Sequence, residues 1–214
     1  MKSFEEQVET LVERGYPTLL GCTAADFRDR LRPLSDYALS VATENDIQNG
    51  KIGFVLVIHT ERLPVEQTLP LICRQGKPAI ERLYPRAPGF FKPLDSLTPA
   101  IGDAYLLFDV DRGNDTLNMI PLQAAQYLGQ SNRTPVTLQE GVALLTQFPE
   151  LLQPNRCFMM LGSRGPDKRV PALWLSDSQP KLGWCWEGNP HTWLGFASGA
   201  GRSPHVLLQE KSAP

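Results

Sequence analysis

The side chains best suited to recognition are concentrated near the end of the chain, where all four tryptophans fall within residues 174–193. Tryptophan rings supply contact area, an imidazole exchanges a proton near neutral pH, and a guanidinium grips two oxygens of an anion. Glycines in the same segment let a ligand approach the backbone. The predicted binding surface for a small molecule or a partner protein therefore consists of Trp184, Trp186, His191, Trp193 and Arg202, together with Asp111 from an earlier turn.

The spacing of these residues gives each one a functional and a structural interpretation. On an extended strand, Trp184 and Trp186 point to the same face, which is either hydrophobic core or an aromatic floor for a planar ligand. In both cases we expect Trp184 to be mostly buried. His191 follows the turn-forming pair Asn189-Pro190, so it is either an acid-base group or a histidine held by a backbone hydrogen bond. If the segment binds a ligand, His191 and Arg202 should converge on one cleft with a tryptophan.

Three shorter motifs also have two interpretations. The glycines of residues 195–202 can form a nest of backbone amides for an anion, although the lysine of a P-loop is missing. Residues 109–115 do not match the ligand positions of a calcium loop, so we expect a turn after a strand, with Asp111 and Arg112 exposed at the edge of a cleft. The loop 162–169 has three basic residues and is either a solvated hairpin tip or a steering site for an acidic partner or a phosphate.

No reaction signature accompanies these residues. The sequence contains neither a Gly-x-Ser-x-Gly elbow nor a His-Glu-x-x-His helix, and its four cysteines form no Cys-x-x-Cys pair. No metal site is predicted, and no cofactor is identified. A hydrolase or transferase that uses His191 with Arg202 and either Asp109 or Asp111 is the alternative to binding, and a structural interaction module is the third hypothesis. Catalytic groups dispersed in sequence leave no spacing signal, so the three hypotheses stay open.

Composition narrows the class of protein. The chain of 214 residues fits one large or two small domains, and its net charge of -2 lacks the basic excess of nucleic-acid binders. Its polar start is unlike a signal peptide, and no apolar run approaches the roughly 20 residues that cross a bilayer. We therefore expect a cytoplasmic protein with no membrane or nucleic-acid partner. Its cysteines should be reduced thiols, and a Cys157–Cys185 disulfide would require neighbouring strands.

Local patterns predict the elements that position these residues. Ser3 with Glu6 and Thr137 with Glu140 are capping boxes, and Thr23 with Asp26 is a further N-terminal cap. Residues 52–58 form a nearly continuous apolar run, which is typical of a buried central strand. Residues 69–73 and 79–83 suit strands joined by a turn, 105–110 suit another strand, and 122–128 suit a helix.

The last third of the chain predicts a β-meander. Residues 157–161, 170–175 and 182–186 are short strand candidates with turn-like connections, so they should be adjacent and antiparallel. The predicted fold class is α+β, a single domain over residues 1–203 with a helical N-terminal part and an antiparallel sheet that includes this meander. Residues 204–214 would form a C-terminal tail.

Several runs of residues carry a resemblance to a known family. They are residues 104–113, 133–145, 157–164, 169–175 and 180–195, which include Pro180-Lys-Leu-Gly-Trp-Cys-Trp186, and more loosely 15–17 and 54–57. With these runs the chain resembles an uncharacterised bacterial family, domain-of-unknown-function family 5701. The resemblance implies a cytosolic bacterial protein. It brings no activity, so it assigns no catalytic role to any residue.

Overall fold

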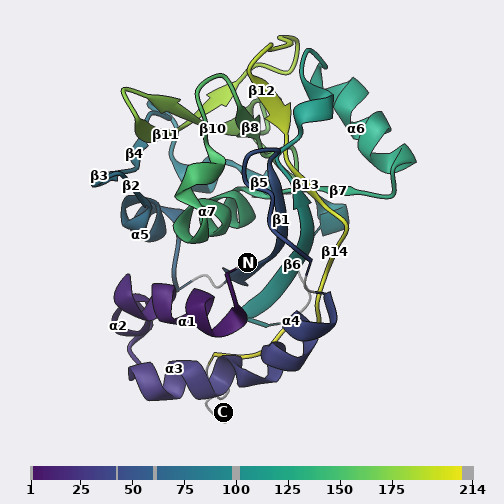
Figure 1. Ribbon diagram of the computed structural model, residues 1–214. Helices are drawn as coiled ribbons and strands as arrows, with labels where there is room; N and C mark the ends of the chain where they lie inside the picture. The colour runs from purple at the N-terminus through teal and green to yellow at the C-terminus, as the bar shows by residue number, and fades with distance from the viewer. Residues whose placement is uncertain (1, 42, 60–61, 98–101, 209–214) are drawn as a thin grey trace.

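The computed structural model describes residues 2–41, 43–59, 62–97 and 102–208 (Figure 1). Within this part of the chain, helices gather in the N-terminal part and most strands pair antiparallel, so the predicted α+β class is confirmed. None of the described helices combines the length and the apolar character needed to cross a membrane. The α-helices are α1 (Phe4–Glu13), α2 (Tyr16–Leu20), α3 (Ala24–Leu31), α4 (Ser35–Val41), α5 (Val65–Thr68), α6 (Pro121–Gln130) and α7 (Leu138–Gln147).

The remaining elements are short 3-10 turns and strands. The 3-10 turns are η1 (Arg32–Leu34), η2 (Leu69–Leu71), η3 (Pro88–Phe90), η4 (Asp95–Leu97), η5 (Asn114–Thr116) and η6 (Pro149–Leu151). The strands are β1 (Lys51–Ile58), β2 (Cys73–Arg74), β3 (Lys77–Pro78), β4 (Ile80–Glu81), β5 (Lys92–Pro93), β6 (Ala104–Asp111), β7 (Thr134–Pro135), β8 (Cys157–Met159), β9 (Ser163–Arg164), β10 (Val170–Ser176), β11 (Gln179–Cys185), β12 (Leu194–Phe196), β13 (Ser198–Gly199) and β14 (Gly201–Arg202).

Side-chain caps start the helices where the sequence predicts them. The Ser3 hydroxyl accepts from the Glu6 N–H, and the Glu6 carboxylate accepts from the Ser3 N–H, which satisfies two amides that the helix leaves free. Thr137 and Glu140 repeat this capping box at α7. Thr23 accepts from the Asp26 N–H at the start of α3. These three predictions are confirmed.

The first sheet has the order β1-β6-β13-β7, and β14 also pairs with β6. Strands β1 and β6 are antiparallel over their whole length. Helices α1 to α4 cover one face, where they share a hydrophobic cluster with Phe54 and Leu56, whereas Val55 and Val57 face the cluster that contains α7 and the second sheet (Figure 1). Burial of both faces explains why β1 is a continuous apolar run.

Residues 52–58 form a buried strand, as predicted, but the predicted central position is wrong, because β1 lies at the edge of the sheet. The side chain of Gln7 in α1 covers that edge. Its amide donates to the Phe54 carbonyl (3.1 Å) and accepts from the Leu56 N–H (2.9 Å), as a neighbouring strand would. A buried glutamine therefore satisfies an edge that would otherwise expose unpaired backbone groups.

The second sheet has the order β12-β8-β10-β11-β4. Strands β8, β10 and β11 are neighbours and antiparallel, which confirms the predicted meander, although β4 and β12 join it in parallel. A two-residue turn with positive φ at Asp177 and Ser178 connects β10 to β11, as the twist of a tight hairpin requires. Strand β10 separates Cys157 from Cys185, and all four cysteines are free.

The predicted strands over residues 69–73 and 79–83 are mostly wrong. Residues 69–71 form the 3-10 turn η2, and only short pieces, β2 and β4, are extended. The predicted turn at Gln75-Gly76 is present, with positive φ at both residues, and it joins β2 to β3. Pro70 fits the first turn of a helix, so the alternation of apolar residues here reflects helix packing rather than a strand.

Candidate functional site

Two tryptophans of the predicted surface share one face with a cation. The Arg169 guanidinium carbon lies 4.0 Å from the ring centroid of Trp184 and 5.8 Å from that of Trp186. Trp184 is partly buried and packs against the main hydrophobic cluster, whereas Trp186 is 45% exposed. An arginine over aromatic faces gains a cation-π attraction. The strand β11 and the loop before β10 therefore build an aromatic and basic face together.

Ion pairs connect this face to the loop 162–169. One carboxylate, that of Glu187, forms ion pairs with both Arg164 (2.6 Å) and Lys168 (3.3 Å). We call the set Trp184, Trp186, Arg164, Lys168, Arg169 and Glu187 the tryptophan surface.

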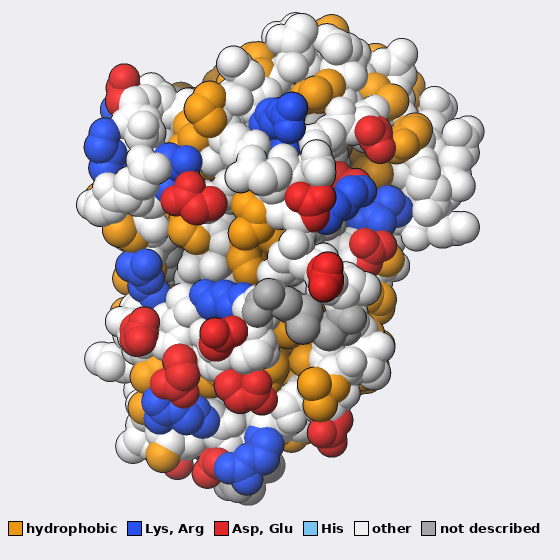
Figure 2. Space-filling model, viewed as in Figure 1, with side chains coloured by type: hydrophobic (Ala, Val, Ile, Leu, Met, Phe, Trp, Pro, Cys, Tyr) orange, Lys and Arg blue, Asp and Glu red, His pale blue; other side chains and the backbone are white. Residues whose placement is uncertain are grey.

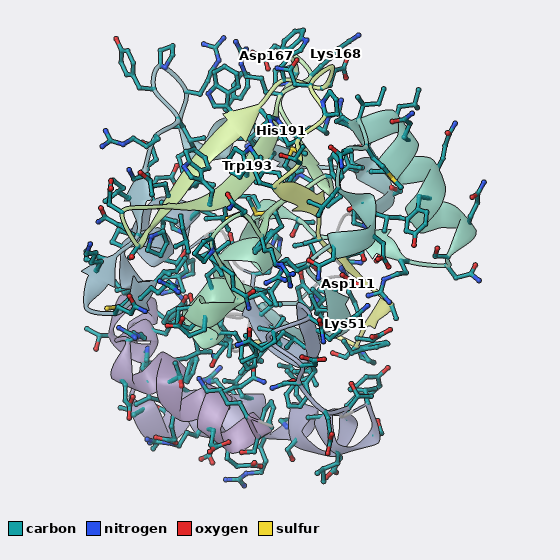
Figure 3. The ribbon with its side chains drawn as sticks, turned by 45° about the horizontal axis from the view of Figure 1, so that its top comes forward. Lys51, Asp111, Asp167, Lys168, His191 and Trp193 are labelled. Atoms are coloured by element: carbon teal, nitrogen blue, oxygen red, sulfur yellow. The ribbon has the colours of Figure 1, made fainter. Side chains whose placement is uncertain are left out.

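Asp167 occupies the centre of a second group of charges at the same end. Its carboxylate forms ion pairs with Arg86 and Arg169. Arg86 also lies over the ring of Phe90, at 4.8 Å from the centroid. Figure 3 shows Asp167 and Lys168 at the top of the molecule. Two arginines, Arg86 and Arg169, therefore lie beside Asp167 at this end of the molecule.

A cavity of about 400 Å³ adjoins the tryptophan surface. The start of α6 forms its apolar wall through Ile120, Leu122 and Ala125. Arg164, Glu187 and Gly188 form the opposite, polar wall.

His191 and Trp193 lie next to one another in the turn after β11. Their rings meet edge to face with centroids 5.6 Å apart (Figure 3). The His191 carbonyl accepts from the Asn118 N–H (2.9 Å), which attaches the turn to the segment after η5. Burial lowers the pKa of His191. The imidazole is therefore mainly neutral at neutral pH, and its Nε2 has no hydrogen-bond partner within the described residues.

Asp111 lies at the end of β6, away from His191 in Figure 3. Its carboxylate forms an ion pair with Lys51 and accepts from the Gly113 N–H (2.6 Å). The prediction that Arg112 is exposed at the edge of a cleft is wrong, because this side chain is fully buried and donates to the Leu151 carbonyl (2.8 Å). The aspartate- and glycine-rich string is thus a turn, as predicted, held by its own side chains.

Arg202 takes part in a different, buried set of contacts. Its guanidinium donates to both carboxylate oxygens of Glu140 (2.5 and 2.9 Å) and to the Thr134 hydroxyl (2.8 Å). The Tyr105 hydroxyl also donates to Glu140 (2.9 Å). We call Tyr105, Thr134, Glu140 and Arg202 the Glu140 network. Burial, and then the Glu140 charge, raises the pKa of Tyr105 well above its usual value, so the phenol stays protonated.

Two histidines flank the Glu140 network. The His205 ring stacks on Tyr105 with centroids 4.3 Å apart, and the His59 ring lies 6.5 Å from Tyr105. Burial lowers the pKa of His205, and the nearby His59 and Arg202 act in the same direction. Sequence reasoning identified Glu140 only as a helix cap and missed both histidines, because the residues that meet here come from four distant segments.

The contacts separate the predicted site residues into groups. Trp184 and Trp186 meet through Arg169, and His191 meets Trp193. Among the described residues, no hydrogen bond, ion pair or ring contact joins Arg202 to His191 or to a tryptophan. Their convergence on one cleft thus stays a prediction without a contact in its favour. The sequence analysis did not join Glu187 or the three basic residues of the loop 162–169 to the tryptophans, although those three cations in one loop were a visible signal.

The described residues therefore form an α+β protein with an aromatic and basic surface, and they contain no cluster of three or more histidine, cysteine or acidic residues that could hold a metal ion. The chain belongs to DUF5701, a family of unknown function, whose model matches residues 10–205. The resemblance inferred from the sequence is thus confirmed. No curated protein and no solved structure matches the chain.

Proposed function

We propose that the protein binds a small, planar, anionic molecule at the tryptophan surface. The observation that carries this proposal is that Arg164 and Lys168 share a single carboxylate, Glu187, beside the cavity of about 400 Å³. Two cations with one counter-charge leave an excess positive charge next to an apolar wall. Such a combination suits a ligand with a flat apolar body and one acidic group.

Trp186 supports the same conclusion. Its ring is 45% exposed, and a side chain at Gly188, which lines the cavity, would begin only 3.4 Å from it. A large exposed ring at the rim of a cavity supplies stacking area for a planar molecule. Trp184 is more deeply packed, so it supports the surface from beneath.

The contacts of the charged residues favour binding over the catalytic alternative. Asp109 is paired with Arg133, Asp111 with Lys51, and Arg202 with Glu140. His191 shares none of these contacts. A partner protein is the second candidate, because Tyr84 and Leu122 are large apolar side chains exposed on the described surface.

Isothermal titration calorimetry with 2-naphthalenesulfonate tests the proposal, with 2-naphthalenemethanol as the uncharged match. We expect Lys168→Met to weaken binding by up to roughly fivefold, which corresponds to an exposed ion pair of about 1 kcal/mol. Trp186→Ala should weaken it by about tenfold. Lys77→Met, which removes the same charge from β3, should leave the affinity unchanged.

Three results would count against this site. They are an absence of binding by the sulfonate, equal binding of the neutral compound, and equal effects of Lys168→Met and Lys77→Met. Concentration-dependent self-association in sedimentation velocity that Tyr84→Ser or Leu122→Ser abolishes would instead support the interaction-module hypothesis.

A further inference from the structure

A second cavity, of about 200 Å³, lies at the start of α7. Its walls come from the end of β1, from α5, from η3 with β5, and from β9, together with the start of α7. Figure 1 shows α5 beside α7. We call it the α7 cavity. It shares no lining residue with the cavity beside the tryptophan surface.

The lining of the α7 cavity has an apolar and a polar part. Val65, Phe91 and Leu138 contribute apolar surface, together with three prolines. His59, Glu66, Lys92, Gln139 and Ser163 contribute polar groups. Because these polar groups come from five segments that are distant in sequence, the fold itself brings them to one place.

Hydrogen bonds fix the wall that α7 provides. The Leu138 N–H donates to the Ser163 hydroxyl (2.9 Å), and the Gln139 amide donates to the Ile58 carbonyl (3.0 Å). The Thr137 N–H donates to Glu140, the central carboxylate of the Glu140 network (2.7 Å). A wall held in this way loses little entropy when a ligand enters, which favours binding.

The described lining of the α7 cavity has one cationic side chain, Lys92, and one acidic side chain, Glu66. Lys92 is exposed and has no ion-pair partner among the described residues. Glu66, the acidic residue of the lining, already accepts from the Gly89 N–H (3.3 Å). That hydrogen bond directs the Glu66 carboxylate towards η3, whereas the ammonium of Lys92 has no described carboxylate beside it, so Lys92 is the group of the lining that can attract an anion next to the apolar side chains.

We propose that the α7 cavity is a binding site for a small carboxylic acid with a short apolar body. The carboxylate lies by Lys92 and His59, and the hydrocarbon part contacts Val65, Phe91 and Leu138. The volume equals about seven water molecules at roughly 30 Å³ each, which suits a chain of a few carbons. This site is independent of the tryptophan surface.

Histidine NMR provides a direct test, because the chain has only three histidines. Hexanoate is added to the full-length protein while the imidazole Cε1 protons are followed, with hexanamide as the neutral match. We expect the His59 signal to shift in a saturable way, while the His191 signal beside Trp193 stays in place. Hexanamide should bind more weakly by roughly threefold to tenfold.

Two variants locate the site. Lys92→Ala should weaken hexanoate binding by roughly threefold to tenfold, without loss of structure because Lys92 is exposed. Lys77→Ala removes an equal charge elsewhere and should have no effect. The proposal is overturned if no saturable His59 shift occurs, if Lys92→Ala binds as well as the unmodified protein, or if the His191 signal responds instead.

Discussion

The tryptophan surface and the Glu140 network use similar residues in opposite surroundings. In each, an arginine is positioned by a carboxylate and lies near aromatic rings. On the tryptophan surface the rings reach solvent. Lys168, one of the two ion-pair partners of Glu187, is also exposed. In the Glu140 network the Glu140 side chain is 0% exposed and that of Arg202 is 17% exposed. The two regions therefore differ in burial rather than in residue type: the tryptophan surface is exposed to solvent, whereas the Glu140 network lies inside the protein.

The two regions also occupy different places in the fold. The tryptophan surface borders the outer end of the second sheet, where loops leave room for a cavity. The Glu140 network joins α7 to β6, β7 and β14, so it connects the first sheet to the helix that packs against it. Exposed ion pairs contribute little to stability, whereas a buried pair is costly to break.

The largest effect should follow from Arg202→Met. This change leaves the Glu140 carboxylate buried with the Tyr105 hydroxyl and the Thr137 N–H as its donors, so we expect the free energy of unfolding to fall by roughly 3–5 kcal/mol. Urea denaturation measures the loss. The matched control is Arg28→Met, whose pair with Glu9 is 43% and 48% exposed and should contribute less than about 1 kcal/mol.

A double variant separates the ion pair from the packing around it. If Glu140 and Arg202 interact directly, Glu140→Gln combined with Arg202→Met should destabilise less than the sum of the two single changes. Additive losses would show that Glu140 and Arg202 do not stabilise each other, and that their ion pair is not what connects α7 to the first sheet.

A smaller loss should follow from Trp184→Ala. The ring packs against the main hydrophobic cluster on one side and Arg169 on the other, so its removal should cost about 3 kcal/mol. Trp186→Ala removes an equally large but more exposed ring and should cost about 1 kcal/mol or less. Equal losses in urea denaturation would contradict the assignment of Trp184 as the packed ring that supports the surface and of Trp186 as its exposed ring.

The parts of the fold that could be predicted are those that local physics decides. Capping at Ser3 and Thr137 depends on residues three positions apart, and the β10–β11 hairpin depends on its own turn. The edge position of β1 could not be predicted in this way. It depends on Gln7, which is far away in sequence and looks like an ordinary polar residue of α1.

The same distinction applies to the candidate sites. Alternation along a strand placed Trp184 and Trp186 on one face, as their shared contact with Arg169 indicates. The partner of Arg202 could not be predicted, because Glu140 already had a local role in its capping box. Nothing in the sequence showed that the same carboxylate also serves a contact across the fold.

The pH dependence of stability offers a finer test of the Glu140 network. The pKa of His205 is lowered from 6.5, so the unfolded chain binds this proton more tightly than the folded chain does. The stabilisation is complete above the unfolded value and is lost as the pH falls through the folded value. We expect the urea midpoint to decrease from about pH 7.5 to about pH 5.5.

His205→Phe keeps a ring against Tyr105 but cannot titrate, so its midpoint should change less over the same interval. The comparison is made within each variant, so any change in baseline stability cancels. His191→Phe should also reduce the pH dependence, because burial lowers the pKa of His191 in the same direction. An unchanged pH dependence in His205→Phe would show that His205 does not couple to folding.

The smallest effects concern Asp111, which the sequence placed in the binding site. Lys51→Met breaks a partly exposed ion pair and should change the free energy of unfolding by less than about 1 kcal/mol. Asp111→Ala also removes the acceptor for the Gly113 N–H and should cost about 1 kcal/mol more, whereas Asp111→Asn keeps an oxygen there and should recover most of that loss. In calorimetry, Asp111→Asn should leave the affinity for 2-naphthalenesulfonate unchanged, because the contacts of Asp111 are with Lys51 and Gly113. A loss of affinity in a stably folded Asp111→Asn would return this residue to the binding site and extend that site towards the first sheet.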